Sequence, residues 1–138
     1  MILYNLFPLL AGPFSRWPEH FARAAAMNFD WVFINPIQQL GASRSLYSIA
    51  DYSRFNPALL DSRSNASPEE QVRQMTAQAH AAGLKVMIDL VINHCAIDSP
   101  LTREHPDWFV RGPDGRIANS ACEHNGEKVV WQALAQFD

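Results

Sequence analysis

The chain has 138 residues, of which 48% are hydrophobic, and a formal net charge of -3. This composition is typical of a soluble globular protein, and the length fits one domain or part of one. The mild acidity gives no reason to expect nucleic acid or an anionic membrane as a partner, and no apolar run is long enough to span a bilayer.

The N-terminus and the cysteines indicate where the protein resides. Residues 1–12, MILYNLFPLLAG, lack a basic region and are interrupted by Pro8, so they predict a strand and not a signal peptide. Cys95 and Cys122 could pair in principle. Without an export signal we expect free thiols and a cytoplasmic location.

The first half of the chain predicts two strands, two helices and a loop. Residues 2–7 and 31–34 have the apolar character of buried strands, and a helix begins near Pro18 and ends near Asn28. The stretch after Pro36, with Gly41 and the segment SRSLYSIADYSRFNP at 43–57, is interpreted as a loop. The next helix has the clearest start, because Ser67 is followed by proline and two glutamates, and Gly83 is its expected stop.

The segment from Leu84 to His94, LKVMIDLVINH, is the most informative stretch of the sequence. Its near-continuous apolar run predicts a parallel strand covered on both faces. Asp89, Asn93 and His94 interrupt or end the run. In parallel α/β folds, ligands bind at the C-terminal ends of the strands, so we expect functional side chains here.

The remainder predicts little regular structure. Residues 98–126 carry repeated proline and glycine turn signals and are interpreted as a long functional loop, and residues 129–137 as a short strand or a turn. Strands alternating with helices predict an α/β fold with a parallel sheet. The pattern alone leaves a doubly wound sheet and a (β/α)₈ barrel open, although no glycine-rich phosphate loop supports nucleotide binding.

Six stretches resemble one known family, the α-amylase superfamily (glycoside hydrolase family 13). DLVINH, from Asp89 to His94, is similar to its first signature, an aspartate, three residues and then asparagine-histidine at the end of the third barrel strand. The other similar stretches, in chain order, are YNLFP at 4–8, MNFDW with NPI at 27–37, LYSIADY at 46–52, HPDWF at 105–109 and LAQFD at 134–138. Among subgroups, the chain most resembles bacterial enzymes of the glucan-maltosyltransferase type.

The resemblance implies a fold and an activity. Residues 1–94 would form about three β/α units at the N-terminal part of a (β/α)₈ TIM barrel, and residues 95–138 the start of a domain inserted after strand three. The family hydrolyses or transfers α-1,4-glucosyl units by a retaining mechanism, which needs two carboxyl groups about 5 Å apart. These come from strands four and five, so we expect no catalytic residue in this chain. The chain alone is expected to be an inactive fragment that needs the remainder of the barrel or a partner chain.

The resemblance also assigns roles to individual residues. Tyr47 matches the aromatic platform on which a sugar stacks, and His94 matches the histidine that hydrogen-bonds a substrate hydroxyl, with Asn93 beside it in the rim. Asp89 matches the aspartate that orients an arginine on strand four. Asp51 is expected to fix its own loop through backbone hydrogen bonds.

The expected ligand is an α-glucan or maltooligosaccharide. Asn93 and Asp138 match positions that bind calcium in some members, and oxygen ligands of this kind suit that ion. Calcium is therefore a candidate ligand, and no other cofactor is expected.

Two other interpretations are considered. The first is a small metal-binding protein, in which nitrogen and sulfur ligands for zinc would come from His94, Cys95, His105, Cys122 and His124, although their spacing matches no standard motif. The second is a non-catalytic carbohydrate-binding protein that uses Tyr47, Trp108 and Trp131 as sugar platforms. Aromatic residues at this density are also normal for a core.

Overall fold

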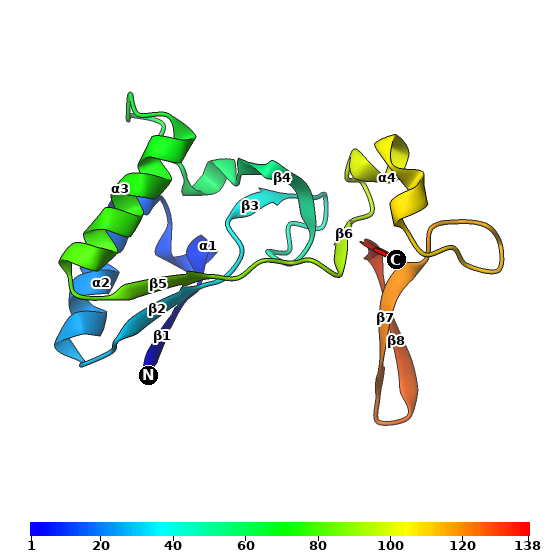
Figure 1. Ribbon diagram of the computed structural model, residues 1–138, viewed down its shortest axis with the longest axis horizontal. Coiled ribbons are helices and arrows are strands. Elements are labelled where there is room, and N and C mark those ends of the chain that lie inside the picture. The colour runs from blue at the N-terminus through cyan, green and yellow to red at the C-terminus, as the bar shows by residue number, and fades with distance from the viewer. The chain divides into compact units, whose positions relative to one another are not determined.

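The computed structural model describes all residues from Met1 to Asp138 and consists of two compact units (Figure 1). The first, here called the sheet unit, comprises residues 1–37 and 55–90. The second, here called the hairpin unit, comprises residues 38–54 and 91–138. None of the helices has the length and apolarity that crossing a membrane requires.

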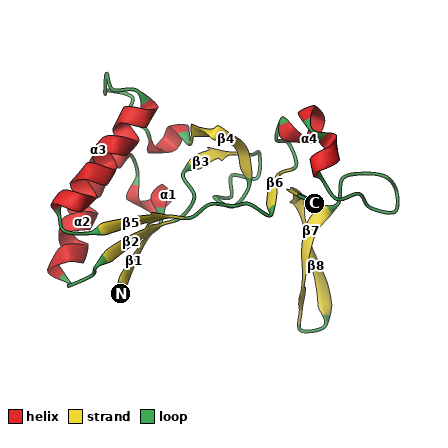
Figure 2. Ribbon diagram, in the orientation of Figure 1, coloured by secondary structure: helices red, strands yellow, loops and turns green.

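The sheet unit is an α/β structure (Figure 2). Its parallel sheet has the order β1 (Leu3–Leu6), β2 (Trp31–Ile34) and β5 (Lys85–Ile88). The longest helices are α2 (Trp17–Ala26) and α3 (Pro68–Ala81). The remaining elements are short: α1 (Pro8–Ala11), η1 (Phe14–Arg16) and η2 (Pro57–Leu59). The predicted α/β class and both predicted N-terminal strands are confirmed.

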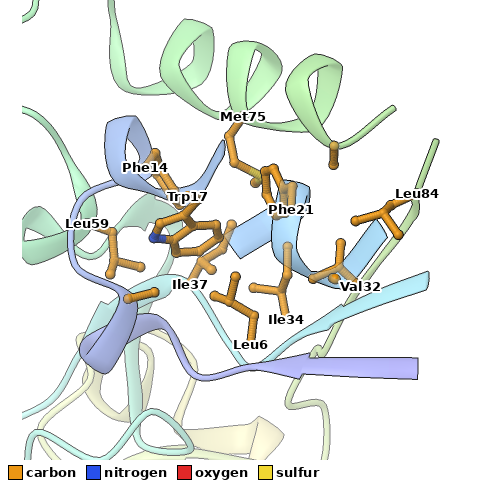
Figure 3. Packing of buried hydrophobic residues seen from close by; sticks show 13 residues of the cluster. Leu6, Phe14, Trp17, Phe21, Val32, Ile34, Ile37, Leu59, Met75 and Leu84 are labelled. Atoms are coloured by element: carbon orange, nitrogen blue, oxygen red, sulfur yellow. The ribbon is translucent and has the colours of Figure 1, made fainter. Parts of the chain in front are cut away.

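A single apolar core joins the helices to one face of this sheet (Figure 3). Alternate strand residues point to the same face, and this face carries Leu6, Val32 and Ile34, each 2% exposed or less. Trp17 is fully buried, packs edge-to-face on Phe14 with ring centroids 4.8 Å apart, and donates an indole hydrogen bond of 2.8 Å to the Gly12 carbonyl. The indole therefore fills the core with its polar group satisfied.

Both predicted helix ends have the expected geometry. The Ser67 hydroxyl accepts a hydrogen bond of 3.2 Å from the Glu70 amide and caps α3, which begins with Pro68. Gly83 follows α3 with φ 82°, and Asn28 follows α2 with φ 61°. These left-handed conformations suit glycine and asparagine and stop the helices there.

The strand predicted from Leu84 to His94 is wrong in length and in burial. β5 ends at Ile88, and the amide of Asp89 donates the next hydrogen bond, 2.8 Å long, to the Ile34 carbonyl. Ile92 is 75% exposed, and Leu3, on the sheet face away from the core, is 41% exposed. Helices cover one face of the sheet only, and a short apolar run does not reveal whether one or both faces are buried.

The hairpin unit contains two small sheets. One pairs β3 (Gln38–Leu40) with β4 (Ile49–Phe55). The other is antiparallel with the order β6 (His94–Ala96), β8 (Glu127–Gln136) and β7 (Asn119–His124). Between β6 and β7 in the chain lie α4 (Leu101–Glu104) and η3 (Pro106–Trp108). Its core is small: Cys95, Phe109 and Ala135 are buried, and Phe137 stacks on Phe109.

Two predictions about loops are wrong. The predicted loop after Pro36 contains β3 and β4, and the segment 98–126 contains α4, η3 and β7. Asn125 and Gly126 both have positive φ, 52° and 79°, and join β7 directly to β8. Asn-Gly is the preferred sequence for such a two-residue hairpin turn. The β7 residues are mostly polar and exposed, so they lack the apolar alternation that marks a half-buried strand.

The predicted domains 1–94 and 95–138 stay a prediction about the complete protein. In the structure, residues 38–54 group with residues 91–138, so the hairpin unit is formed from two separate segments of the chain.

An irregularity in the β7–β8 pairing depends on Asn119. Asn119 pairs with Ala135 and Ala121 with Val130, so the two strands do not match residue for residue between these pairs. The Asn119 side-chain amide donates to the carbonyls of Gln132 and Leu134, at 3.1 and 2.9 Å. The Asn119 side chain thus donates hydrogen bonds in place of the backbone amides that would donate them in a regular β-ladder.

We expect Ser67→Ala to lower the free energy of unfolding by about 1 kcal/mol, because it removes the N-cap of α3. Chemical denaturation of both variants measures the difference. Ser62→Ala is the matched control, since Ser62 is exposed and has no such cap, and its effect should lie near zero. Equal effects for the two variants would contradict the capping role.

We expect Asn119→Ala to lower the free energy of unfolding by about 1–2 kcal/mol, because two carbonyls lose their donor. Asn119→Asp should destabilise the chain further, since a carboxylate would face those carbonyls. Thermal unfolding checks both, with Asn65→Ala, an exposed site, as control. A neutral effect of Asn119→Asp would show that the side chain does not bridge the strands.

Candidate functional site

The structure brings together two of the predicted substrate-binding residues, Tyr47 and His94. His94 is the first residue of β6, and its Nε2 atom lies 2.9 Å from the Tyr47 carbonyl oxygen. Because a carbonyl only accepts, Nε2 carries the proton, and Nδ1 of the neutral ring is an acceptor. Nδ1 is buried and has no hydrogen-bond partner within the protein. An acceptor without a protein partner can accept a hydrogen bond from a hydroxyl group of a ligand.

Tyr47 is presented by a compact loop, residues 41–48, here called the Tyr47 loop. The amide of Gly41 donates a 2.8 Å hydrogen bond to the Ser48 carbonyl, which closes the loop on itself. Arg44 adopts φ 59° within the loop. Leu46 is 3% exposed whereas Tyr47 is 41% exposed. Leu46 therefore anchors the loop, and the next residue, Tyr47, faces solvent.

Three side chains tie residues 41–52 to the segment that follows β5. The Tyr52 hydroxyl donates a 2.8 Å hydrogen bond to the carbonyl of His94. The Ser99 hydroxyl donates to the carbonyl of Ala50 at 2.7 Å. The Asp98 carboxylate accepts from the amide of Ala42 at 3.0 Å. The three contacts join residues that are 42, 49 and 56 positions apart in the sequence, so the site is built by long-range hydrogen bonds.

Asp51 lies in β4 and accepts two hydrogen bonds from Ser53, at 2.6 Å from the hydroxyl and 2.8 Å from the amide. These bonds favour the ionised form and hold the pKa of Asp51 below its ordinary value, with the hydroxyl contributing most. Arg54 lies 3.9 Å away, but its side chain is 72% exposed and its contribution is small. Asp51 thus organises its own strand.

Two side chains near the site, Tyr52 and Cys95, have raised pKa values. Desolvation is the largest cause of the raised pKa of the Tyr52 phenol, and it also raises the pKa of the Cys95 thiol to about 11. Cys95 is fully buried and Cys122 is exposed, and both thiols are free as predicted. A buried, protonated Cys95 is a packing residue and not a nucleophile.

The other predicted site residues are less closely associated. Asp89 follows β5 in the sheet unit and is half-buried. Asn93 is exposed in the hairpin unit, where its carbonyl accepts a 3.2 Å hydrogen bond from the Phe137 amide. Asp138 is exposed, and its amide donates to the Trp108 carbonyl at 2.9 Å.

The structure contains no group of three or more histidine, cysteine, aspartate or glutamate side chains arranged to hold a metal ion. The zinc interpretation, with His94, Cys95, His105, Cys122 and His124, is therefore not supported by the geometry. Asn93 and Asp138 could supply only part of the six to eight oxygen ligands that calcium takes. A calcium site at these two residues does not follow from the donors present and stays a prediction.

Comparison with solved structures places the fold among α-amylase-type proteins. The chain is similar to the maltogenic α-amylase AmyB from Thermotoga neapolitana, with a TM-score of 0.79 and 24% identity over 100% of this chain and 32% of that one. It is also similar to an α-amylase from Lactobacillus plantarum, with a TM-score of 0.78 and 26% identity over 99% of this chain and 31% of that one. The class is that of the α-amylase superfamily, as the sequence motifs predicted.

A family model described as "Glycogen debranching enzyme, glucanotransferase domain" matches residues 2–110. The chain belongs to this family. It is 25% identical to the alpha-1,4-glucan:maltose-1-phosphate maltosyltransferase of Picrophilus torridus over 130 residues, 83% of this chain and 20% of the relative. It is 34% identical to the glycogen debranching enzyme of Saccharomyces cerevisiae over 94 residues, 67% of this chain and 6% of the relative. The chain spans a fifth or less of these curated relatives.

The sequence predicted Tyr47 and His94 as substrate-binding residues but did not reveal the residues that hold them in place. Tyr52, Asp98 and Ser99 act through single long-range hydrogen bonds, which leave no periodic pattern in the sequence. Asp98 was interpreted only as the start of a loop. The one available signal was Gly41, because a glycine within a polar loop can mark a close approach of the backbone.

The pKa values predict instability at alkaline pH. A folded-state pKa raised above the unfolded value stabilises the protein below the unfolded pKa, and this contribution is lost as pH rises. For Cys95 and Tyr52 the loss begins near the ordinary values of 9.0 and 10.0. We therefore expect the free energy of unfolding to fall as pH rises above about 9, measured by urea denaturation.

Cys95→Ala should weaken this pH dependence between these two values, whereas Cys122→Ala, at an exposed thiol, should leave it unchanged. A stability that is constant from neutral pH to beyond the ordinary pKa of tyrosine would contradict the assignment.

Proposed function

We propose that the chain forms the first part, about three β/α units, of the (β/α)₈ barrel of an enzyme that transfers or hydrolyses α-1,4-glucosyl units. The parallel order β1-β2-β5 and the match of nearly the whole chain to about a third of two α-amylase structures support this placement. Residues after β5 would begin the domain inserted after the third barrel strand. The remainder of the barrel, or a partner chain, would complete the fold.

The observation that carries the proposal is the contact between His94 and Tyr47. Sugar sites combine an apolar surface for the ring with a few oriented polar groups for the hydroxyls. Tyr47 offers an exposed aromatic residue, and His94 offers a buried Nδ1 acceptor, because the Tyr47 carbonyl holds a ring proton on Nε2. Asn93, exposed and adjacent to His94, adds an amide that both donates and accepts. The ligand would be an α-glucan or maltooligosaccharide.

The catalytic carboxyl groups would lie outside these residues. Retaining cleavage of a glycosidic bond needs a nucleophilic carboxylate and an acid/base about 5 Å apart. In the α-amylase superfamily these lie on strands four and five, and Asp89 would orient an arginine on strand four. This chain would therefore position the sugar beside the cleaved bond without cleaving it.

Transfer is favoured over hydrolysis as the reaction of the complete enzyme. The matching family is described by its glucanotransferase domain, and several relatives are named as maltosyltransferases. In a transfer reaction the hydroxyl of a second glucan would replace water as the acceptor. Hydrolysis is the second candidate, since α-amylases are among the similar structures.

We expect maltooligosaccharides to perturb the NMR signals of Tyr47 and His94 in this chain, and Tyr47→Ala to weaken binding roughly tenfold, about 1.4 kcal/mol. Tyr47→Phe should retain most of the affinity, because the ring remains. Trp108→Ala is the matched control, since Trp108 is a half-exposed aromatic outside the proposed site, at 48%.

Loss of binding in Trp108→Ala as well as in Tyr47→Ala would favour the non-catalytic carbohydrate-binding interpretation. The same samples should show no turnover of maltooligosaccharides. Turnover that survives repurification would mean that carboxylates within these residues perform the reaction, and would overturn the placement of the active site.

A further inference from the structure

Asp98 is an exposed carboxylate that lies two residues after β6, outside every motif that the sequence singled out. Its Oδ2 atom accepts a 3.0 Å hydrogen bond from the amide of Ala42, near the start of the Tyr47 loop. A carboxylate that accepts from a backbone amide makes a stronger bond than a neutral acceptor does. Asp98 therefore fixes the position of the loop backbone at this residue.

The neighbouring Gly41 shows how closely the loop approaches this segment. A Cβ atom at Gly41 would overlap the Cβ atom of Ala96 and would lie 2.6 Å from Oδ1 of Asp98. The start of the loop is thus pressed against residues 96–98, and only glycine fits there. Close packing at Gly41 and a charge-assisted hydrogen bond at Ala42 therefore both hold the start of the loop.

Hydrogen bonds within the loop connect its start to Tyr47. The Gly41 amide bonds the Ser48 carbonyl at 2.8 Å, and the Ser48 amide bonds the Ser45 carbonyl at 3.0 Å. The carbonyl of Tyr47 lies within this closed segment and accepts from Nε2 of His94 at 2.9 Å. Ser99 and Tyr52 bond the carbonyls of Ala50 and His94, which lie outside the Tyr47 loop.

We propose that Asp98 is a positioning residue: by fixing the Tyr47 loop at Ala42, it places the Tyr47 carbonyl where it holds His94 in the Nε2–H tautomer, with Nδ1 left as the acceptor. The use of Nδ1 for a sugar hydroxyl rests on the proposed function, whereas the tautomer does not. Without the Asp98 contact, the carbonyl moves, and the imidazole loses the partner that selects one tautomer.

The test is long-range ¹H–¹⁵N NMR of the histidine side chains of the whole chain, recorded above the ordinary imidazole pKa of about 6.5. His94→Asn assigns the signals. The unmodified chain should show His94 as a single Nε2–H tautomer. Asp98→Ala should give signals averaged between the two tautomers, and Asp98→Asn should restore the single tautomer, because the amide oxygen can still accept from Ala42.

Asp107→Ala is the matched control, an exposed aspartate of the hairpin unit without a hydrogen bond to the Tyr47 loop, and it should leave the spectrum unchanged. A folded Asp98→Ala variant that keeps the single Nε2–H tautomer would overturn the proposal. So would an equal loss in Asp98→Ala and Asp107→Ala.

A measurement on the unmodified chain covers the case in which Asp98→Ala fails to fold. The Ala42 amide should exchange its hydrogen roughly tenfold more slowly than an unbonded loop amide, the size expected from one hydrogen bond. Unprotected exchange at Ala42 would overturn the proposal. Absence of maltooligosaccharide binding with the single tautomer retained would contradict the proposed function and leave the role of Asp98 intact.

Discussion

Hydrogen bonds from side chains to distant backbone atoms hold the candidate site together. The hairpin unit has a small apolar core, so its two sheets and the Tyr47 loop depend on polar contacts for their positions. Tyr52, Asp98 and Ser99 each satisfy one backbone group on a segment about fifty residues away. Such contacts are directional, and they fix the geometry of a site more closely than apolar packing of the same area would.

The sheet unit uses a different physical principle. Large aromatic and aliphatic side chains on one face of β1, β2 and β5 pack against α2 and α3, and Trp17 lies fully buried among them. The hydrophobic effect has no direction, so the alternation of the strands and the helix caps decide which residues enter the core. This unit carries no predicted substrate-binding residue.

These two principles explain which features could be predicted from the sequence. β1, β2, α2 and α3 of the sheet unit were predicted because periodic apolar residues and caps such as Ser67 are local signals. Tyr47 and His94 were predicted only through the resemblance of short motifs to a family. β3, β4 and β7 were missed because their residues are mostly half-buried or exposed and show no clear alternation. Asp98 was missed because its partner, Ala42, is 56 positions away.

The two thiols differ in a way that makes the hairpin unit open to chemical measurement. Cys122 is exposed on β7, whereas Cys95 is fully enclosed between β8 and Tyr52 with its proton firmly held. An alkylating reagent therefore meets one thiol at once and the other only when the small core opens. The ratio of the two labelling rates gives the equilibrium constant for that opening, next to the histidine on which the site depends.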